Sequence, residues 1–384
     1  MDDFTRDFLN SKIARTPQPF CPDARSVNYV PSGPSDKVTT GLINALTGQA
    51  GTSRRLSGYP TYQELPLICS APVEWGDCFF TQILYDGSMR KRINYYSDGL
   101  KLSGILSTPD NSEGRRFPGV VLVPGFMSTA DAFFPGFAEE LNAGGFVALT
   151  MDFRGFGESE GVRGEVIPYL QIYDARNAIS YLQSRPEVNP DQIALLGVSL
   201  GGGEVAYIAA QDRRVKCVAS MVLVGDGERR MRRFRTEQEW ETLMQKVQED
   251  RINRALTGKS KDFHGFLGKG TDSVLIMPPD LASSLKSAEQ VEKEKGNRTT
   301  LATVDGWLGY KPEEIIDKVS PTPILFVQAE KDELEADDAD RLYSKAKEPK
   351  KLFTLKGGVH FDVYGKRTNE AMQPVLEWFK QYLQ

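Results

Sequence analysis

The pentapeptide at 197–201 constrains the fold of this chain more than any other stretch. It reads Gly-Val-Ser-Leu-Gly, follows the apolar run 193–196, and precedes residues 202–210, whose composition favours a helix. A Gly-x-Ser-x-Gly sequence between a buried strand and a helix is typical of a sharp turn with the serine at its apex. Side chains in place of the two glycines would collide with the crossing strand and helix. The stretch therefore predicts that Ser199 projects from a strand end as a candidate nucleophile; the alternative is a Gly/Ser loop without function.

Strands and helices alternate around this turn, which predicts an α/β protein with a mostly parallel, doubly wound sheet flanked by helices. The expected strands are 79–85, 89–96, 100–108, 119–123, 146–151, 193–196, 217–224, 322–328 and 351–356. The expected core helices are 132–143, 170–184, 202–210 and 369–383. Ser97-Asp98-Gly99 indicates a turn, so the sheet is expected to start with an antiparallel hairpin. Pro374 should kink the last helix or mark its start.

The alternation stops in the middle of the chain, which predicts four segments. The core is expected at 79–227 and 320–384, separated by a helical lid insertion at 228–319. Within this insertion, helices are expected at 236–256, 281–295 and 312–318. Residues 1–78 are punctuated by prolines and predict an N-terminal extension, with short helices at 3–14 and 37–46. This extension is expected to serve in dimerisation or to cover the mouth of the active site. A poorly ordered arm is the alternative.

Composition excludes several classes of function. The 384 residues carry a formal net charge of -5, which argues against general nucleic-acid binding and gives no reason to expect an anionic membrane surface as partner. No apolar stretch approaches the roughly 18 residues of a membrane span, and the acidic N-terminus does not resemble a signal peptide. The four cysteines lack metal-type spacing. A cytoplasmic protein with reduced thiols and without metal or cofactor is expected; a homodimer stays open.

A serine hydroxyl needs a base to take its proton, and the chain contains only two histidines. His360 follows the expected strand at 351–356 after two glycines, in a loop that can reach the serine. We therefore expect His360 to be the base. His264 lies in the insertion away from a strand end, where packing is the simpler role and a substrate contact the alternative.

The base in turn needs a carboxylate that orients it and stabilises its charged form. In sheet hydrolases the order along the chain is serine, acid, histidine. Asp332 follows the strand at 322–328 and fits this order. Asp226, directly after the preceding strand, is the rival acid.

An oxyanion hole requires two backbone N–H donors aimed at the developing negative charge. One should belong to Leu200, the residue after the candidate nucleophile. The other should come from the loop at 124–128, where Phe126 is the expected donor and a plain strand-ending turn at Gly125 is the alternative.

Residues 79–384 resemble the α/β-hydrolase superfamily, in its branch of dienelactone-hydrolase-like and acyl-peptidase-like proteins. The stretch 152–159 matches the D-x-R-G-x-G-x-S turn common there, which supports the sheet and is not catalytic. Glu239-Trp240-Glu241 and Pro278-Pro279-Asp280 are similar to a subgroup that includes fungal polyketide transferases and bacterial esterase-like hydrolases. Pro124 replaces the usual histidine before the oxyanion-loop glycine. Residues 1–78 fall outside the resemblance.

Together these features predict a serine hydrolase that cleaves an ester or thioester of a small acyl substrate through an acyl-enzyme on Ser199. Acyl transfer from the same intermediate, amide or peptide cleavage, and a non-catalytic binding protein are the alternatives. Five arginines between 229 and 235 open the insertion; a solvated face is the simpler interpretation, and binding of a carboxylate or phosphate the other. Arg154 and Glu165 are further candidates for lining the mouth.

Overall fold

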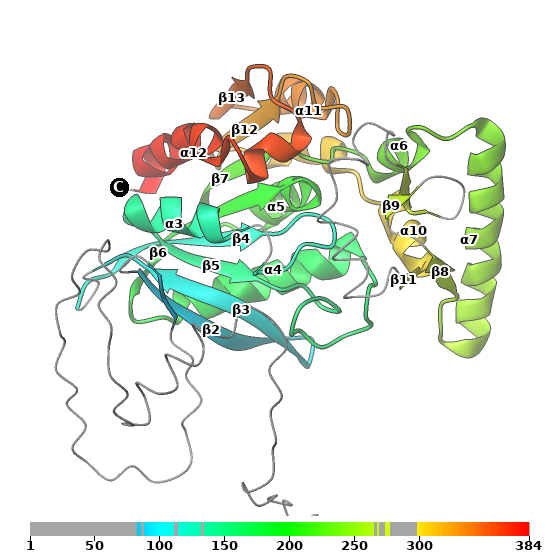
Figure 1. The fold of residues 1–384 in the computed structure, drawn as a ribbon, viewed down its shortest axis with the longest axis horizontal. Helices are drawn as coiled ribbons and strands as arrows, with labels where there is room; N and C mark the ends of the chain where they lie inside the picture. The colour runs from blue at the N-terminus through cyan, green and yellow to red at the C-terminus, as the bar shows by residue number, and fades with distance from the viewer. Residues whose placement is uncertain are drawn as a thin grey trace, which may run out of the picture. The chain divides into compact units, whose positions relative to one another are not determined.

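Nine strands of the described residues pair into one sheet (Figure 1). They are β1 (Ile83–Tyr85), β2 (Ser88–Ser97), β3 (Leu100–Thr108), β4 (Phe117–Val123), β5 (Val147–Met151), β6 (Val188–Val198), β7 (Val215–Met221), β12 (Ile324–Ala329) and β13 (Lys350–Leu355). Their spatial order is β1-β2-β3-β5-β4-β6-β7-β12-β13. Pairing is antiparallel from β1 to β5 and parallel from β5 to β13. The predicted sheet, with its antiparallel start, is confirmed.

The computed structural model describes residues 83–85, 88–110, 114–131, 134–264, 267–268, 273–276 and 298–383. All of them fall within the contact unit Gly76–Gln384. The predicted extension, with its helices at 3–14 and 37–46, lies outside the described residues, as do the expected helix at 281–295 and the segment 278–280.

Helices cover both faces of the sheet, because the central strands are apolar on both sides. They are α3 (Pro135–Ala143), α4 (Pro168–Gln183), α5 (Leu200–Gln211), α11 (Asp338–Lys345) and α12 (Thr368–Leu383). Every residue of β4 is buried. Val120 and Leu122 pack in a core with residues of α3 and α12, while Val121 and Val123 pack in a second core with residues of α4 and α5. The alternation of strand side chains therefore assigns each pair of helices to its own face.

Two expectations about the C-terminal part need correction. Helix α12 begins at Thr368, so Pro374 lies inside it and does not mark its start. Helix α11 has no counterpart among the expected helices. It has only eight residues, four of them charged, and of its apolar residues only Ala339 and Leu342 are buried, so the helix is too short to stand out in the sequence.

The insertion between β7 and β12 combines helices with short strands. Its described elements are α6 (Gly227–Arg232), α7 (Glu237–Thr257), β8 (Asp262–His264), β9 (Leu267–Gly268), β10 (Leu275–Ile276), β11 (Arg298–Thr300), α10 (Leu301–Leu308), η1 (Pro312–Glu314) and η2 (Ile316–Lys318). Helices α6, α7 and α10 lie together at one side of the sheet (Figure 1). The long helix was predicted, and Thr236 and Glu239 form a capping box at its start. The paired strands β8–β11 and β9–β10 were not predicted, and the expected helix at 312–318 is two 3-10 turns.

The turn between β6 and α5 has the conformation that its pentapeptide predicts. Ser199 has φ 56° and ψ -118°, a region that non-glycine residues rarely adopt. A Cβ atom at Gly197 would lie 2.1 Å from the carbonyl oxygen of Gly201. A Cβ atom at Gly201 would lie 2.3 Å from the carbonyl oxygen of Val123. Both glycines are therefore required, because backbone segments pass too close to the turn for any side chain.

Replacing Gly201 by alanine should lower the free energy of unfolding by about 2–3 kcal/mol, because the new methyl group would overlap with backbone carbonyl oxygens of β4. Urea unfolding measures this change. Gly309→Ala is the matched control: Gly309 has φ -87°, and its added Cβ would meet the Tyr169 ring only at 3.7 Å. Equal unfolding midpoints for the two variants would contradict the close approach.

Candidate active site

The carboxyl ends of the parallel strands bring the predicted site residues to one edge of the sheet. Ser199 follows β6, Asp332 follows β12, and His360 follows β13 and begins a short 3-10 turn, η3 (His360–Tyr364). Strands β6, β7, β12 and β13 are consecutive neighbours in the sheet. The loop after β4 approaches from the other side of β6.

Asp332 and His360 are hydrogen bonded in the interior. Nδ1 of His360 lies 2.8 Å from Oδ2 of Asp332, and the two residues are 2% and 8% exposed, respectively. The other carboxylate oxygen, Oδ1, accepts the backbone N–H groups of Leu334 and Glu335, each at 3.0 Å. A carboxylate can only accept hydrogen bonds, so Nδ1 carries the proton and Nε2 faces away from the acid. This is the orientation that a histidine base requires.

The electrostatics of the pair favour an ionised acid and a basic imidazole. Burial raises the pKa of Asp332, but the charge of His360 and the hydrogen bonds outweigh burial and leave the pKa below its ordinary value. Burial lowers the pKa of His360, but the charge and hydrogen bond of Asp332 outweigh it and leave the pKa above its ordinary value of 6.5.

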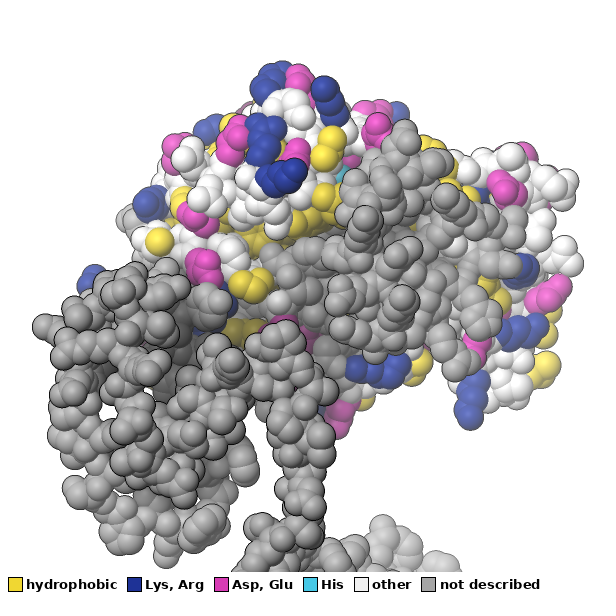
Figure 2. Space-filling model, in the orientation of Figure 1, with side chains coloured by type: hydrophobic (Ala, Val, Ile, Leu, Met, Phe, Trp, Pro, Cys, Tyr) yellow, Lys and Arg dark blue, Asp and Glu magenta, His cyan; other side chains and the backbone are white. Residues whose placement is uncertain are grey.

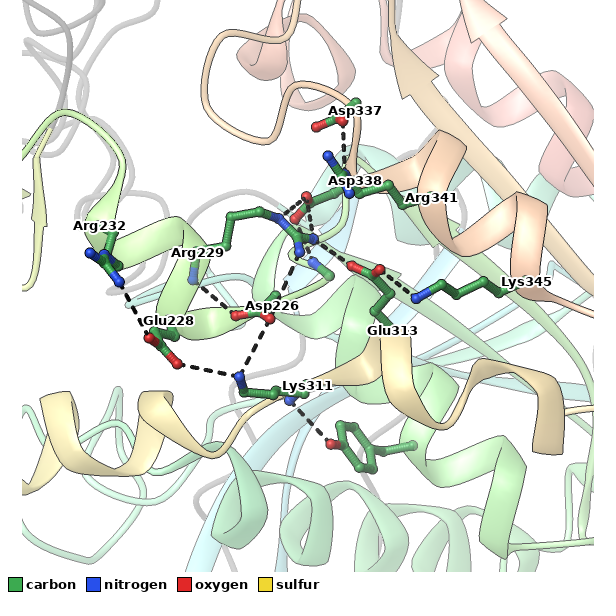
Figure 3. Close-up of polar contacts among 12 residues, drawn as sticks. Asp226, Glu228, Arg229, Arg232, Lys311, Glu313, Asp337, Asp338, Arg341 and Lys345 are labelled. Carbon is green, nitrogen blue, oxygen red and sulfur yellow. Dashed lines mark hydrogen bonds and ion pairs between the residues drawn. The ribbon is translucent and has the colours of Figure 1, made fainter.

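Asp226, the rival acid, has another role. Its Oδ1 atom accepts the backbone N–H of Arg229 at 2.9 Å and so caps the start of α6. Its Oδ2 atom lies 3.7 Å from the ammonium group of Lys311 (Figure 3). The hydrogen-bonded partner of the His360 imidazole is Asp332.

A tyrosine that sequence reasoning missed lies between the candidate nucleophile and the candidate base. The Tyr364 hydroxyl is 3.2 Å from Nε2 of His360, and the side chain of Ser199 is close enough to influence its pKa. Tyr364 lies four residues after His360 on the same 3-10 turn. Its only sequence signal is this spacing.

The segments of the two predicted oxyanion donors flank Ser199. A Cβ atom at Gly125 would lie 3.2 Å from Cβ of Ser199, so the loop after β4 packs directly on the serine. Leu200 is the first residue of α5, where a backbone N–H has no acceptor within the helix. The Phe126 ring meets Trp307 of α10 edge to face, with centroids 5.1 Å apart. The donor roles of the Phe126 and Leu200 N–H groups stay predictions.

The turn at 152–159 supports the sheet edge through its own hydrogen bonds. Asp152 is buried, and its Oδ1 atom accepts the N–H of Ala130 at 2.7 Å. The Ser159 hydroxyl donates to the backbone oxygen of Asp152 at 2.7 Å. Arg154 lies 2.6 Å from the buried Asp174. Arg154 therefore has a structural ion pair, and its place at the site mouth stays a prediction.

Two further candidates lie in or against the insertion. The Glu165 carboxylate accepts the Thr300 hydroxyl at 2.8 Å, which links the loop before α4 to the insertion. His264 is in β8, in register with Arg298 of β11. Its side chain, and with it the choice between packing and substrate contact, lies outside the described part of the structure.

Two arginines at the start of the insertion, Arg229 and Arg230, each bind a carboxylate of the core. Arg229 lies 2.7 Å from Asp338 of α11 and 2.8 Å from Glu313 of η1 (Figure 3). Arg230 is 2% exposed and lies 3.1 Å from Glu335. The expected solvated face is therefore wrong for Arg229 and Arg230, which join the insertion to the segment that follows the acid.

The described surface has few features that suggest another kind of site. No group of three or more His, Cys, Asp or Glu residues in the described ranges could hold a metal ion. None of the described helices is both long and apolar enough to cross a bilayer. Cys217 is a buried free thiol. In the view of Figure 2, the described basic and acidic side chains are interspersed and do not form a field of one sign.

The fold, with Ser199, Asp332 and His360 at one edge of the sheet, is that of an α/β hydrolase. The comparisons with known proteins identify its family. The model of the family described as serine aminopeptidase, S33, matches residues 117–361, so the chain belongs to this family. An uncharacterized 31.7 kDa protein of the traX-finO intergenic region in Escherichia coli is 32% identical over 74% of this chain and 98% of its own length.

Two fungal relatives carry names that describe an activity. The polyketide transferase GrgF of Penicillium sp. is 27% identical over 74% of this chain and 94% of its own length. A thiohydrolase of Eupenicillium brefeldianum is 28% identical over 73% of this chain and 90% of its own length. The crystal structure of the α/β hydrolase GrgF from Penicillium sp. sh18 matches with a TM-score of 0.66, at 24% identity over 77% of this chain and 99% of that chain. This likeness supports the same fold.

The chain has two histidines, so the NMR signal of the His360 imidazole has to be distinguished from only one other during a pH titration. We expect a pKa above 6.5 in the wild type, because the ionised Asp332 stabilises the imidazolium. Asp332→Asn should move this pKa below 6.5, because burial, the largest influence, then acts without the charge of Asp332 and only the more distant Glu335 opposes it. Asp226→Asn is the matched control and should leave it unchanged; a fall in this variant would move the acid to position 226.

Arg230→Ala should lower the free energy of unfolding by about 3 kcal/mol at pH 8, because it leaves the buried Glu335 charge without its partner. Burial raises the pKa of Glu335 to about 7, against the opposing charge of Arg230, so the protonated side chain is favoured at pH 5. The loss should therefore shrink as the pH falls. Calorimetry at both pH values measures it. Arg232→Ala removes an arginine that is 44% exposed and should cost less than about 1 kcal/mol.

Proposed function

We propose that this chain is a serine hydrolase that cleaves an ester or thioester through an acyl-enzyme on Ser199. The observation that carries the proposal is the buried hydrogen bond between Asp332 and His360, whose Nε2 atom is directed to the tyrosine that contacts Ser199. A strained serine, an oriented imidazole and an ionised acid at one sheet edge fit nucleophilic catalysis better than a binding role.

In the proposed reaction the Ser199 oxygen attacks the substrate carbonyl carbon and His360 accepts the serine proton. Asp332 stabilises the resulting imidazolium, which matches the raised pKa of His360. The N–H groups of Leu200 and Phe126 hold the oxyanion, each donor supplying about 3 kcal/mol of transition-state stabilisation. The imidazolium protonates the leaving group. Water, activated by the same histidine, then releases the acid and restores the serine.

The names of the relatives support a small acyl substrate and favour a thioester among acyl donors. One relative is a thiohydrolase and another a polyketide transferase. Acyl transfer is the second candidate, since an alcohol or amine can intercept the same acyl-enzyme when water is excluded. The family description adds aminopeptidase activity as a third outcome to test. We also propose a cytoplasmic location, which rests only on the composition of the chain.

Wild-type protein should react with a fluorophosphonate probe and hydrolyse a model acyl thioester, whereas Ser199→Ala should do neither, with a loss on the order of 10⁴-fold or more in kcat. Ser220→Ala, which removes the hydroxyl that donates to the Gly202 carbonyl, is the control and should keep labelling. An unreactive wild type, or labelling that survives in Ser199→Ala, refutes the proposal. Product analysis with added alcohols and an aminoacyl anilide separates hydrolysis, transfer and peptidase activity.

A further inference from the structure

We propose that the Tyr364 hydroxyl relays the proton from Ser199 to His360. The inference rests on the proposed function and adds a residue to it. It stands on the position of one side chain: the Tyr364 hydroxyl lies 3.2 Å from Nε2 of the base, where a nucleophile would otherwise bind, and the Ser199 side chain lies close to the same hydroxyl. The Tyr364 hydroxyl is therefore placed to connect the side chains of the serine and the histidine.

The hydrogen bonds of this chain of groups have one consistent direction. Asp332 accepts from Nδ1 of His360, so Nε2 is an acceptor. The Tyr364 hydroxyl then donates its proton to Nε2, and its oxygen keeps a lone pair that can accept the proton of the neighbouring Ser199 hydroxyl. The serine proton can therefore reach the base through the tyrosine oxygen.

The proposed step balances in atoms and charge. The Ser199 oxygen forms its bond to the carbonyl carbon, and the electron pair of the C=O bond moves to the carbonyl oxygen. The serine proton passes to the Tyr364 oxygen while the tyrosine proton passes to Nε2 of His360. Tyrosine is neutral before and after, His360 gains one positive charge, and the oxyanion carries one negative charge. Release of the leaving group uses the reverse relay or direct donation by the imidazolium.

Burial decides how the two transfers are timed. The Tyr364 side chain is partly buried against the core, and the loss of hydration at its hydroxyl raises its pKa far above the ordinary value of 10. A tyrosinate intermediate is therefore strongly disfavoured, so the second proton must leave as the first arrives. Two protons in motion in one transition state give a signature that a purely structural tyrosine cannot give.

The fold holds Tyr364 in this place. His360 and Tyr364 occupy one 3-10 turn, with ring centroids 5.8 Å apart. The fully buried Val363 anchors the turn, and its carbonyl oxygen accepts the Thr368 hydroxyl at 3.2 Å at the start of α12. Movement of the tyrosine away from the histidine would therefore disturb the turn that also holds the base.

Tyr364→Phe keeps the ring and removes the relay atom, so kcat for thioester hydrolysis should fall about 100-fold, at the low end of general acid–base contributions. Tyr382→Phe makes the same change near the end of α12 and should leave kcat unchanged. A rate that is kept or increased in Tyr364→Phe overturns the relay, since the hydroxyl would then only separate serine from histidine.

A proton inventory in mixtures of light and heavy water provides the second measurement and needs no variant. Wild-type kcat for the acylation step should curve with deuterium fraction, as two moving protons require, and the plot for Tyr364→Phe should be linear. A linear wild-type plot overturns the relay even if the variant does not fold. If the wild type neither hydrolyses the thioester nor reacts with the probe, the proposed function itself is wrong. If the wild type is active and Tyr364→Phe is equally active, only the relay is wrong.

Discussion

The close approach of backbone segments around Ser199 is the constraint on which the site depends. The two glycines of its turn leave space that carbonyl oxygens of the turn and of β4 almost fill. The loop after β4 rests on the serine side chain through Gly125. Ser199 thus occupies a strained conformation that the neighbouring strand and helix impose. The strained backbone sets the direction in which the side chain of this candidate nucleophile leaves the turn.

The candidate acid and base depend on a second constraint, the cost of burying charge. Asp332 and His360 are both in the interior and balance one another, while two backbone N–H groups satisfy the other carboxylate oxygen. Glu335, three residues on, is buried as well and has Arg230 of α6 as its partner. The loop that carries the acid is therefore held between the core and the inserted segment by groups that cannot be left unpaired.

Much of this arrangement was predictable because parallel strands end at one edge. The sheet, the strained serine turn and the contact between Asp332 and His360 all follow from strand order and turn chemistry. Tyr364 was not predictable, since an aromatic residue after a histidine gives no periodic or motif signal. The same holds for the short strands β8 and β11, which pair over three residues, and for the partners of Arg229 and Arg230. Those contacts depend on tertiary packing between distant segments.

The two ends of the inserted segment are tied to one set of carboxylates. Arg229 at its start and Glu313 at its end meet each other, and Lys311 pairs with Asp226 and Glu228 beside them (Figure 3). A segment whose two ends are held by ion pairs can change in length and sequence between them without displacing the loop that carries Asp332. The length and sequence of this segment can therefore vary independently of the hydrogen bond between Asp332 and His360.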